Sequence, residues 1–139
     1  MILLIAATNE PWSIDLALKR EGRFGQTVLV PHPDLESRKQ IFSLALKDKP
    51  VSTDVVFEKL AGLTEGYSGA DITAIVNLAI DQTMQRYFTT KYLQDITFAD
   101  LLFGIDQVKP RIKQWYAKAN KIITERNEQE GYGELVAVI

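Results

Sequence analysis

The segment from Ser68 to Met84 constrains the fold of this chain more than any other stretch. Its apolar residues recur at spacings of three and four, which places them on one face of an α-helix. Ser68 is followed three residues later by Asp71, and this pair forms the capping-box pattern that begins a helix. We therefore predict an amphipathic helix that must bury one face against other elements. That face comprises Ile72, Ile75, Val76, Ala79, Ile80 and Met84.

Three more helices are predicted after the rigid connector Pro31-His32-Pro33 and before residue 110. Asp34 can cap a helix that runs to about Lys47. A second helix begins near Asp54, and the pair Thr97 and Asp100 repeats the capping-box pattern before a third apolar stripe. The residues predicted on the inner faces are Ile41, Leu44 and Ala45, then Val56, Phe57, Leu60 and Ala61, then Phe98, Leu101, Leu102, Ile105 and Val108.

A last helix is predicted to begin at Arg111, because Pro110 is tolerated at a helix start. Its expected inner face comprises Ile112, Trp115, Ala119, Ile122 and Ile123, and an apolar tail, Leu135 to Ile139, follows. A core within a helical bundle is one interpretation of this stripe, and a docking surface for a partner is the alternative.

The first quarter of the chain has a different sequence pattern. Met1 to Thr8 is a short continuous apolar run that predicts a strand buried on both faces, as in parallel sheets. Thr27 to Val30 predicts a second strand, and a short helical turn through Leu16 to Leu18 lies between them. The apolar start is too short for a membrane span and lacks a basic flank, so we expect neither a transmembrane segment nor a signal peptide. Because a central strand is an unusual first element, we expect the chain to be a piece of a longer protein.

Composition excludes several classes of function. Of the 139 residues, 46% are hydrophobic and 24% are charged, with a net charge of -2, so the charge does not favour a nucleic-acid partner. The chain has no cysteine, and its one histidine, His32, lies between two prolines. We therefore expect no metal site and no catalytic triad. The chain also has no G-x-x-x-x-G-K-[ST] loop for phosphate binding.

Three features are candidates for chemistry, and each has a structural alternative. Asn9 follows the first predicted strand, where open parallel sheets bind ligands, although it could simply stabilise the turn before Pro11. Arg20 and Arg23 suit recognition of a phosphate on a neighbouring molecule, or they could be solvated side chains. The small residues Gly69 and Ala70 would let a ligand approach a helix N-terminus, which could otherwise be only a well-capped helix.

In combination and in this order, the motifs resemble the AAA family of ATPases, in particular its Cdc48-like and Vps4-like groups. The resemblance rests on IAATNEPWSIDLALKREGRF, VPHPDLESRKQIF and LTEGYSGADITAIVNLA. It implies the last strands of a P-loop α/β module in residues 1–33, a helical lid domain in 34–110, and a C-terminal helix and tail in 111–139. The expected fold class is therefore an α/β fragment followed by an α-helical bundle.

The resemblance also implies the role of each candidate residue. Asn9 matches the sensor-1 asparagine that helps to position the attacking water beside the γ-phosphate. Arg20 and Arg23 match arginine fingers, which reach the site of the adjacent subunit. Ile41 matches an apolar position near the adenine, and Gly69 with Ala70 matches the sensor-2 region, where the lid helix passes the nucleotide.

The sequence departs from the family pattern at two places. Many relatives read GRFDR where this chain has Gly25 and Gln26 after Phe24, and some have a nucleotide-contacting histidine at the position of Ala45.

The function that the resemblance implies is ATP hydrolysis in an oligomeric, hexameric ring that remodels protein substrates in the cytoplasm. ATP or ADP with Mg²⁺ would be the cofactor, and the Mg²⁺ ligands would lie outside this chain. A chain without the phosphate loop is expected to be inactive alone. A helical protein-interaction module without catalytic role is the alternative.

Overall fold

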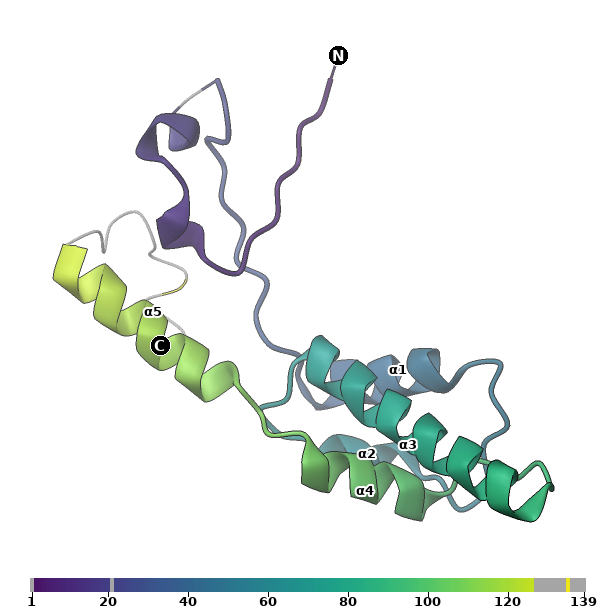
Figure 1. Cartoon of the computed structure of the whole chain (residues 1–139). Helices are drawn as coiled ribbons and strands as arrows, with labels where there is room; N and C mark the ends of the chain where they lie inside the picture. Colours follow the sequence, from purple (N-terminus) through teal and green to yellow (C-terminus); the bar gives the residue numbers. More distant parts are fainter. Residues whose placement is uncertain (1, 21, 127–134, 136–139) are drawn as a thin grey trace. The chain divides into compact units, whose positions relative to one another are not determined.

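The computed structural model describes residues 2–20, 22–126 and 135, and their elements are labelled in Figure 1. The chain divides into two compact units. One unit is His32–Gln114, and the other combines Met1–Pro31 with Trp115–Ile139. The three predicted segments 1–33, 34–110 and 111–139 remain a prediction.

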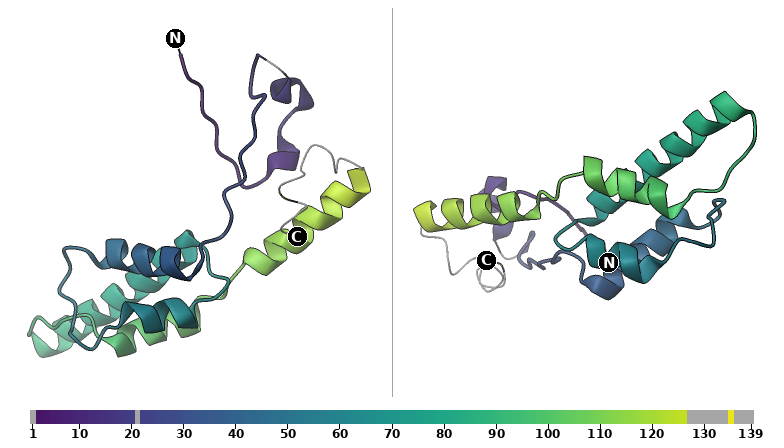
Figure 2. Two further views of the ribbon diagram at one scale, coloured as in Figure 1. Left: turned by 180° about the vertical axis from the view of Figure 1, so that it is seen from behind. Right: turned by 90° about the horizontal axis from the view of Figure 1, so that it is seen from below.

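The unit His32–Gln114 is a bundle built around one long helix, α3. Figure 2 shows α3 with α1 along one side and α4 along another. An isolated parallel bridge joins Val51 to Ile96, and it ties the loop after α1 to the loop before α4. The helices of this unit are α1 (Leu35–Leu46), α2 (Phe57–Leu63), α3 (Gly69–Thr90) and α4 (Phe98–Gln107).

Local sequence fixes where α1, α3 and α4 begin, as predicted. The side chain of Asp34 accepts a hydrogen bond from the Ser37 backbone N–H at the start of α1. A complete capping box, Ser68 with Asp71, begins α3, and α4 begins with the equivalent box. Such caps satisfy backbone N–H groups that have no partner inside the helix. The predicted start of α2 near Asp54 is wrong by three residues, because α2 begins at Phe57.

The core of this unit gathers side chains from all four helices. Its fully buried members include Phe42, Leu60, Ile72, Ile75 and Leu101.

Three residues predicted to face the core are exposed instead, namely Leu44, Met84 and Leu102. Leu44 is 70% exposed, because the buried line of α1 runs through Arg38, Phe42 and Leu46 at four-residue spacing. Leu44 lies about 200° around the helix from Phe42 and therefore points away from the buried core. An apolar residue close in sequence to the buried face of a helix is not necessarily part of that face.

The two predicted strands are not formed. Residues 2–8 and 27–30 are extended, but among the described residues the bridge at Val51 and Ile96 is the sole strand-type pairing. Ile2 is 90% exposed and Val30 is 84% exposed. A strand buried on both faces depends on neighbouring strands for its hydrogen bonds and on helices for its cover. The described residues supply neither, so the apolar run stays extended and unpaired.

The second unit is organised by α5 (Ile112–Arg126) and two short 3-10 helices. The 3-10 helices are η1 (Pro11–Ser13) and η2 (Leu16–Lys19), and η2 confirms the predicted helical turn. Trp12, Ala119, Ile123 and Leu135 are buried together, with Trp115 and Ile122 packed against them. The inner face predicted for the last helix is thus largely confirmed. The predicted tail beyond Leu135 lies outside the described residues.

Candidate functional site

The turn that carries Asn9 is held by α5. The Trp115 indole Nε1–H donates a hydrogen bond to the Asn9 backbone carbonyl, at 2.6 Å. Next to it, Lys118 forms an ion pair with the Glu10 carboxylate at 2.5 Å. The Asn9 side chain is exposed and makes no hydrogen bond to the described residues, so its amide is available to a ligand.

Two tryptophan rings pack together next to these contacts. The rings of Trp12 and Trp115 are 5.6 Å apart between centroids and tilted by 39°. The Lys118 ammonium lies 5.8 Å from the centre of the Trp12 ring, within the range of a cation–π contact. The Lys118 hydrogen bond and positive charge also lower the pKa of Glu10. We call Glu10, Trp12, Trp115 and Lys118 the α5 clamp.

Arg20 and Arg23 lie on one tight loop after η2. The Arg23 backbone N–H bonds the Arg20 carbonyl at 3.2 Å, and Gly22 between them has a φ of +82°, which favours glycine. The Arg23 guanidinium donates to the Ala17 carbonyl at 3.0 Å. The Arg20 side chain is exposed and makes no hydrogen bond or ion pair to the described residues.

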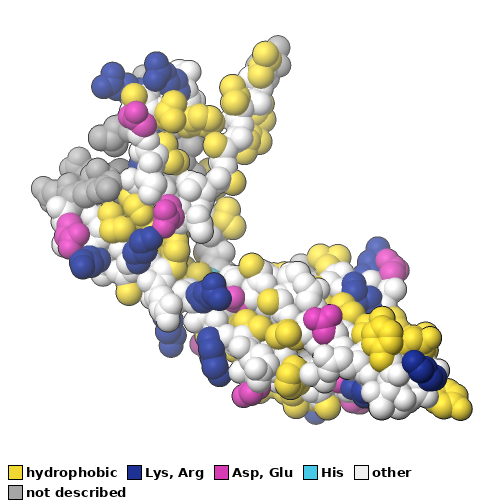
Figure 3. All heavy atoms as spheres, viewed as in Figure 1, with side chains coloured by type: hydrophobic (Ala, Val, Ile, Leu, Met, Phe, Trp, Pro, Cys, Tyr) yellow, Lys and Arg dark blue, Asp and Glu magenta, His cyan; other side chains and the backbone are white. Residues whose placement is uncertain are grey.

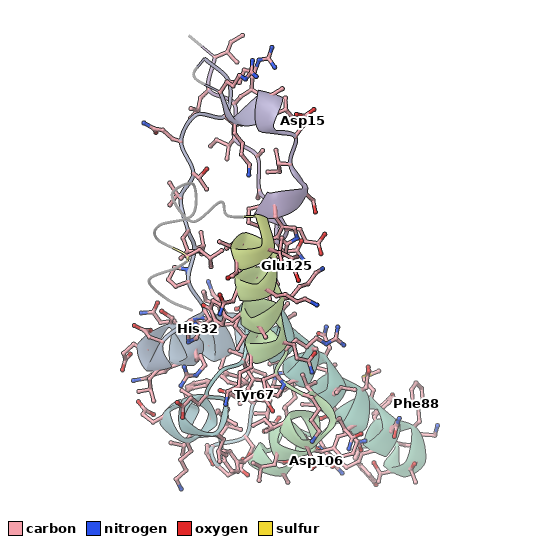
Figure 4. The ribbon with its side chains drawn as sticks, turned by 90° about the vertical axis from the view of Figure 1, so that its left-hand side faces the viewer. Asp15, His32, Tyr67, Phe88, Asp106 and Glu125 are labelled. Atoms are coloured by element: carbon pink, nitrogen blue, oxygen red, sulfur yellow. The ribbon has the colours of Figure 1, made fainter. Side chains whose placement is uncertain are left out.

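The loop thus holds one arginine against the backbone and offers the other to solvent. Figure 3 shows basic side chains gathered at the end of the unit that carries this loop. Asp15, labelled in Figure 4, caps η2 by accepting from the Ala17 N–H at 2.8 Å and so stabilises the base of the loop.

The other predicted contacts lie in the helical unit, between α1 and α3. The Ile41 side chain and Gly69 adjoin each other, since a Cβ built on Gly69 would lie 3.8 Å from Ile41 Cδ1. The structure therefore brings Ile41 to the start of α3, where Ala70 follows and is exposed. A shallow depression of about 390 Å³ opens between the two helices. Its lining residues are Ile41, Leu44, Ala45, Lys49, Thr73, Val76 and Asn77.

The chemistry at the start of α3 favours a neutral group over a phosphate. The Asp71 carboxylate accepts hydrogen bonds from the Ser68 N–H and hydroxyl at 2.9 Å and 2.8 Å, so a negative charge already occupies the first turn. A second anion there would be repelled. Gly69 is not required for packing inside the chain, because a methyl group would meet Ile41 at an ordinary contact distance. An apolar or aromatic ring fits this place better than an anion.

Tyr67 is a supporting residue that the sequence analysis did not single out. It is buried, and its hydroxyl donates to the Val108 carbonyl at 2.9 Å, with the Ile105 carbonyl at 3.4 Å. Burial raises the pKa of Tyr67, and the charges of Asp71 and Asp106 add to this effect. Tyr67 and Asp106 are labelled in Figure 4. Tyr67 thereby fixes the turn before α3 to the end of α4. An aromatic residue directly before the cap residue Ser68 was the sequence signal that could have identified this role.

The predicted site residues thus fall into two groups. Asn9, Arg20 and Arg23 belong to one unit, and Ile41, Gly69 and Ala70 belong to the other. Within the described residues, no cluster of three or more histidine, aspartate or glutamate side chains could hold a metal ion. None of the helices in the described ranges has the length and apolarity that a bilayer crossing needs.

Comparison with known proteins defines the class of the helical unit. Residues 54–98 match the AAA+ lid domain family. A solved structure described as "Structural Basis for Katanin Self-Assembly" superposes with a TM-score of 0.65 and 26% identity, over 78% of this chain and 44% of that chain. The matched part of the helical bundle is therefore similar to an AAA+ lid domain.

Curated relatives agree with this assignment. The chain is 50% identical over 74 residues to a cell division cycle protein 48 homolog of Archaeoglobus fulgidus, covering 53% of this chain and 10% of the relative. It is 47% identical over 78 residues to an ATP-dependent zinc metalloprotease, FTSH 9, of Oryza sativa subsp. japonica, covering 56% and 10%. It is 36% identical over 88 residues to the meiotic spindle formation protein mei-1 of Caenorhabditis elegans, covering 63% and 18%.

In its lid segment the chain is similar to the AAA family of ATPases, as its motifs predicted. It spans between 10% and 18% of the length of these three relatives.

Proposed function

We propose that this chain is the C-terminal portion of an AAA ATPase that uses ATP hydrolysis in an oligomeric ring to remodel proteins. The observation that carries the proposal is the AAA+ lid domain at residues 54–98, preceded in family order by Asn9 and the arginine loop. The fold of a katanin structure concerned with self-assembly supports an oligomer. A hexameric ring in the cytoplasm, acting on protein substrates, is the form that we propose.

In this proposal the lid contacts the base end of ATP or ADP. Ile41 and Gly69 adjoin each other, and the Asp71 charge disfavours phosphate at this place, so the adenine would lie against Ile41, Gly69 and Ala70. Thr73 and Asn77 continue the same face of α3 along the depression. The nucleotide supplies the phosphoryl group, and the Mg²⁺ ligands and phosphate loop would come from residues outside this chain.

Asn9 would orient the attacking water, because its side-chain amide offers one donor group and one acceptor and is exposed at the end of the extended segment. Arg20 and Arg23 would act on the nucleotide of the adjacent subunit. A guanidinium supplied by a neighbour stabilises the charge that develops on the transferred phosphoryl group, and it makes hydrolysis depend on assembly. The chain alone would therefore not hydrolyse ATP.

The test is ATP turnover of the complete ATPase that carries these residues, with wild-type and Arg23→Ala subunits mixed in varying ratios. We expect the variant to bind nucleotide normally and to poison mixed rings, so that activity falls faster than the wild-type fraction. Arg20→Ala is measured in the same way, and Lys121→Ala is the control because Lys121 is a solvent-exposed cation on α5. Turnover unchanged at every ratio for both arginine variants would exclude the arginine-finger roles.

The alternative of a helical interaction module receives no specific support. Trp115 and Ile122, which would have formed its docking face, pack against Trp12 and its neighbours inside their own unit. These contacts favour the interpretation of this stripe as a core.

A further inference from the structure

The contacts between α5 and the Asn9 turn involve the backbone that orients Asn9. Trp115 binds the Asn9 carbonyl itself, and Lys118 binds the side chain of the next residue, Glu10. A carbonyl hydrogen bond fixes the plane of the peptide that joins Asn9 to Glu10. Since the side chain of Asn9 leaves the same Cα, its direction depends on that plane.

This link does not follow from chain proximity. Trp115 and Asn9 are 106 residues apart in the sequence, and Lys118 and Glu10 are 108 apart. Holding an exposed turn in one orientation costs conformational entropy, and several independent contacts are needed to offset it. The clamp supplies a neutral hydrogen bond, an ion pair and an aromatic contact on one turn.

From this geometry we propose that Trp115 is a positioning residue for Asn9, so that α5 sets the orientation of the amide that orients the attacking water. The inference rests on the proposed function of Asn9. It goes beyond that function by assigning to the C-terminal helix a direct effect on the chemical step. Trp115 itself touches no reacting atom in this scheme.

A purely structural role for Trp115 predicts different behaviour. In that case the indole ring matters through its contact with Trp12, and the N–H group is dispensable. Trp115→Phe keeps an aromatic ring and removes the donor to the Asn9 carbonyl, so it separates the two roles. Replacement of Trp115 by 3-benzothienylalanine, whose sulfur takes the place of the N–H with nearly unchanged shape, makes the same separation without any loss of ring area.

The experiment measures kcat, KM for ATP, nucleotide affinity and Tm of the complete ATPase. We expect Trp115→Phe and the benzothienyl variant to lower kcat about tenfold or more, because small misplacements of a catalytic group have effects of this size or larger. KM and nucleotide affinity should change less than about twofold, since the lid contacts are untouched. Lys121→Ala on the same helix should leave all four quantities unchanged.

A double-mutant cycle gives the decisive result. If Trp115 acts through Asn9, Trp115→Phe in an Asn9→Ala background should lower kcat by less than about twofold further, whereas independent effects would multiply. Multiplied losses, or full activity of the benzothienyl variant, would overturn the inference and leave the proposed function intact. Full activity of Asn9→Ala would overturn the inference together with the role of Asn9, while the mixing test with Arg23→Ala judges the proposed function separately.

Discussion

The two units of this chain differ in how their apolar residues are covered. In His32–Gln114, four capped or amphipathic helices enclose a core whose central members, such as Phe42 and Ile72, are fully buried. The other unit has only a small aromatic cluster, and it also contains an apolar segment in which Leu3 and Ile5 are each 81% exposed. In the first unit, the apolar faces that the sequence predicts are buried against one another. In the second unit, the apolar segment at residues 2–8 has no neighbouring strand or covering helix among the described residues.

This contrast shows which kinds of secondary structure a local sequence pattern can predict. A helix makes all its backbone hydrogen bonds within one segment, so periodicity and caps are enough to predict it. A strand cannot form in isolation, because its hydrogen bonds and the residues that bury it come from other segments. Three experiments test this difference between the units.

The largest effect is expected from separating the units. A peptide of residues 32–114 should show a helical circular-dichroism spectrum and one cooperative thermal transition, because its core is complete. A peptide of residues 1–31, which is the second unit without α5, should show no transition, since its apolar residues then have no cover. Phe42→Ala in the longer peptide is the control for the core and should cost about 3–5 kcal/mol of unfolding free energy. A cooperative transition in the short peptide would contradict this contrast.

The next effect concerns the contact between α3 and α4. A methyl group on Gly104 would lie 2.6 Å from the Ile75 carbonyl oxygen and 3.2 Å from its carbon, which is backbone that cannot move aside. We expect Gly104→Ala to lower the unfolding free energy by about 2–3 kcal/mol through overpacking.

Gly62→Ala on α2 is the matched control, because a Cβ there meets nothing within 4 Å. It should raise the unfolding free energy by up to about 1 kcal/mol through helix propensity. Both values come from urea unfolding of the same protein. If both substitutions changed the unfolding free energy in the same direction, α4 would not be held against the α3 backbone.

The smallest effect tests the ion pair that joins the end of α3 to α4. Asp100 is 4% exposed, and both its oxygens accept from the Arg86 guanidinium, one of them at 2.8 Å. Burial raises the pKa of Asp100, but hydrogen bonds from Arg86 and Thr97 outweigh it, and the net pKa is lowered.

A lowered pKa in the folded state means that the unfolded state binds more protons in acid. The stability supplied by Asp100 is therefore present above about pH 4, the ordinary range of the carboxyl group, and is lost as the pH falls through its folded-state value. Asp100→Asn should cost about 1–2 kcal/mol at neutral pH, because Arg86 is one-third exposed and can still reach water. Asp100→Asn should also make the unfolding free energy depend less on pH in the acid range. Asp81→Asn, at an exposed position on α3, should do neither.

The sequence predicted the helical unit well and the detail of its faces less well. Asp34, Ser68 and Thr97 were predicted as caps and act as caps, because each needs only a backbone N–H two or three residues away. Leu44 shares a face with Ile41 and Ala45 as predicted but is exposed, because the docking of α1 against α3 decides how much of that face is buried. The buried Arg38 was also not predicted, and it is satisfied by the carbonyl of Ala61, which is 23 residues away.

For the candidate site, the sequence alone determined which residue types stand in which order. Asn9, the arginine pair and the small residues at Gly69 and Ala70 were found as motifs, and the family followed from their order. The tertiary structure decided which residues support them, because Trp115 and Tyr67 act through contacts 106 and 41 residues away along the chain. Local patterns report hydrogen bonds that close within a few residues, whereas contacts over such separations exist only once the helices have packed.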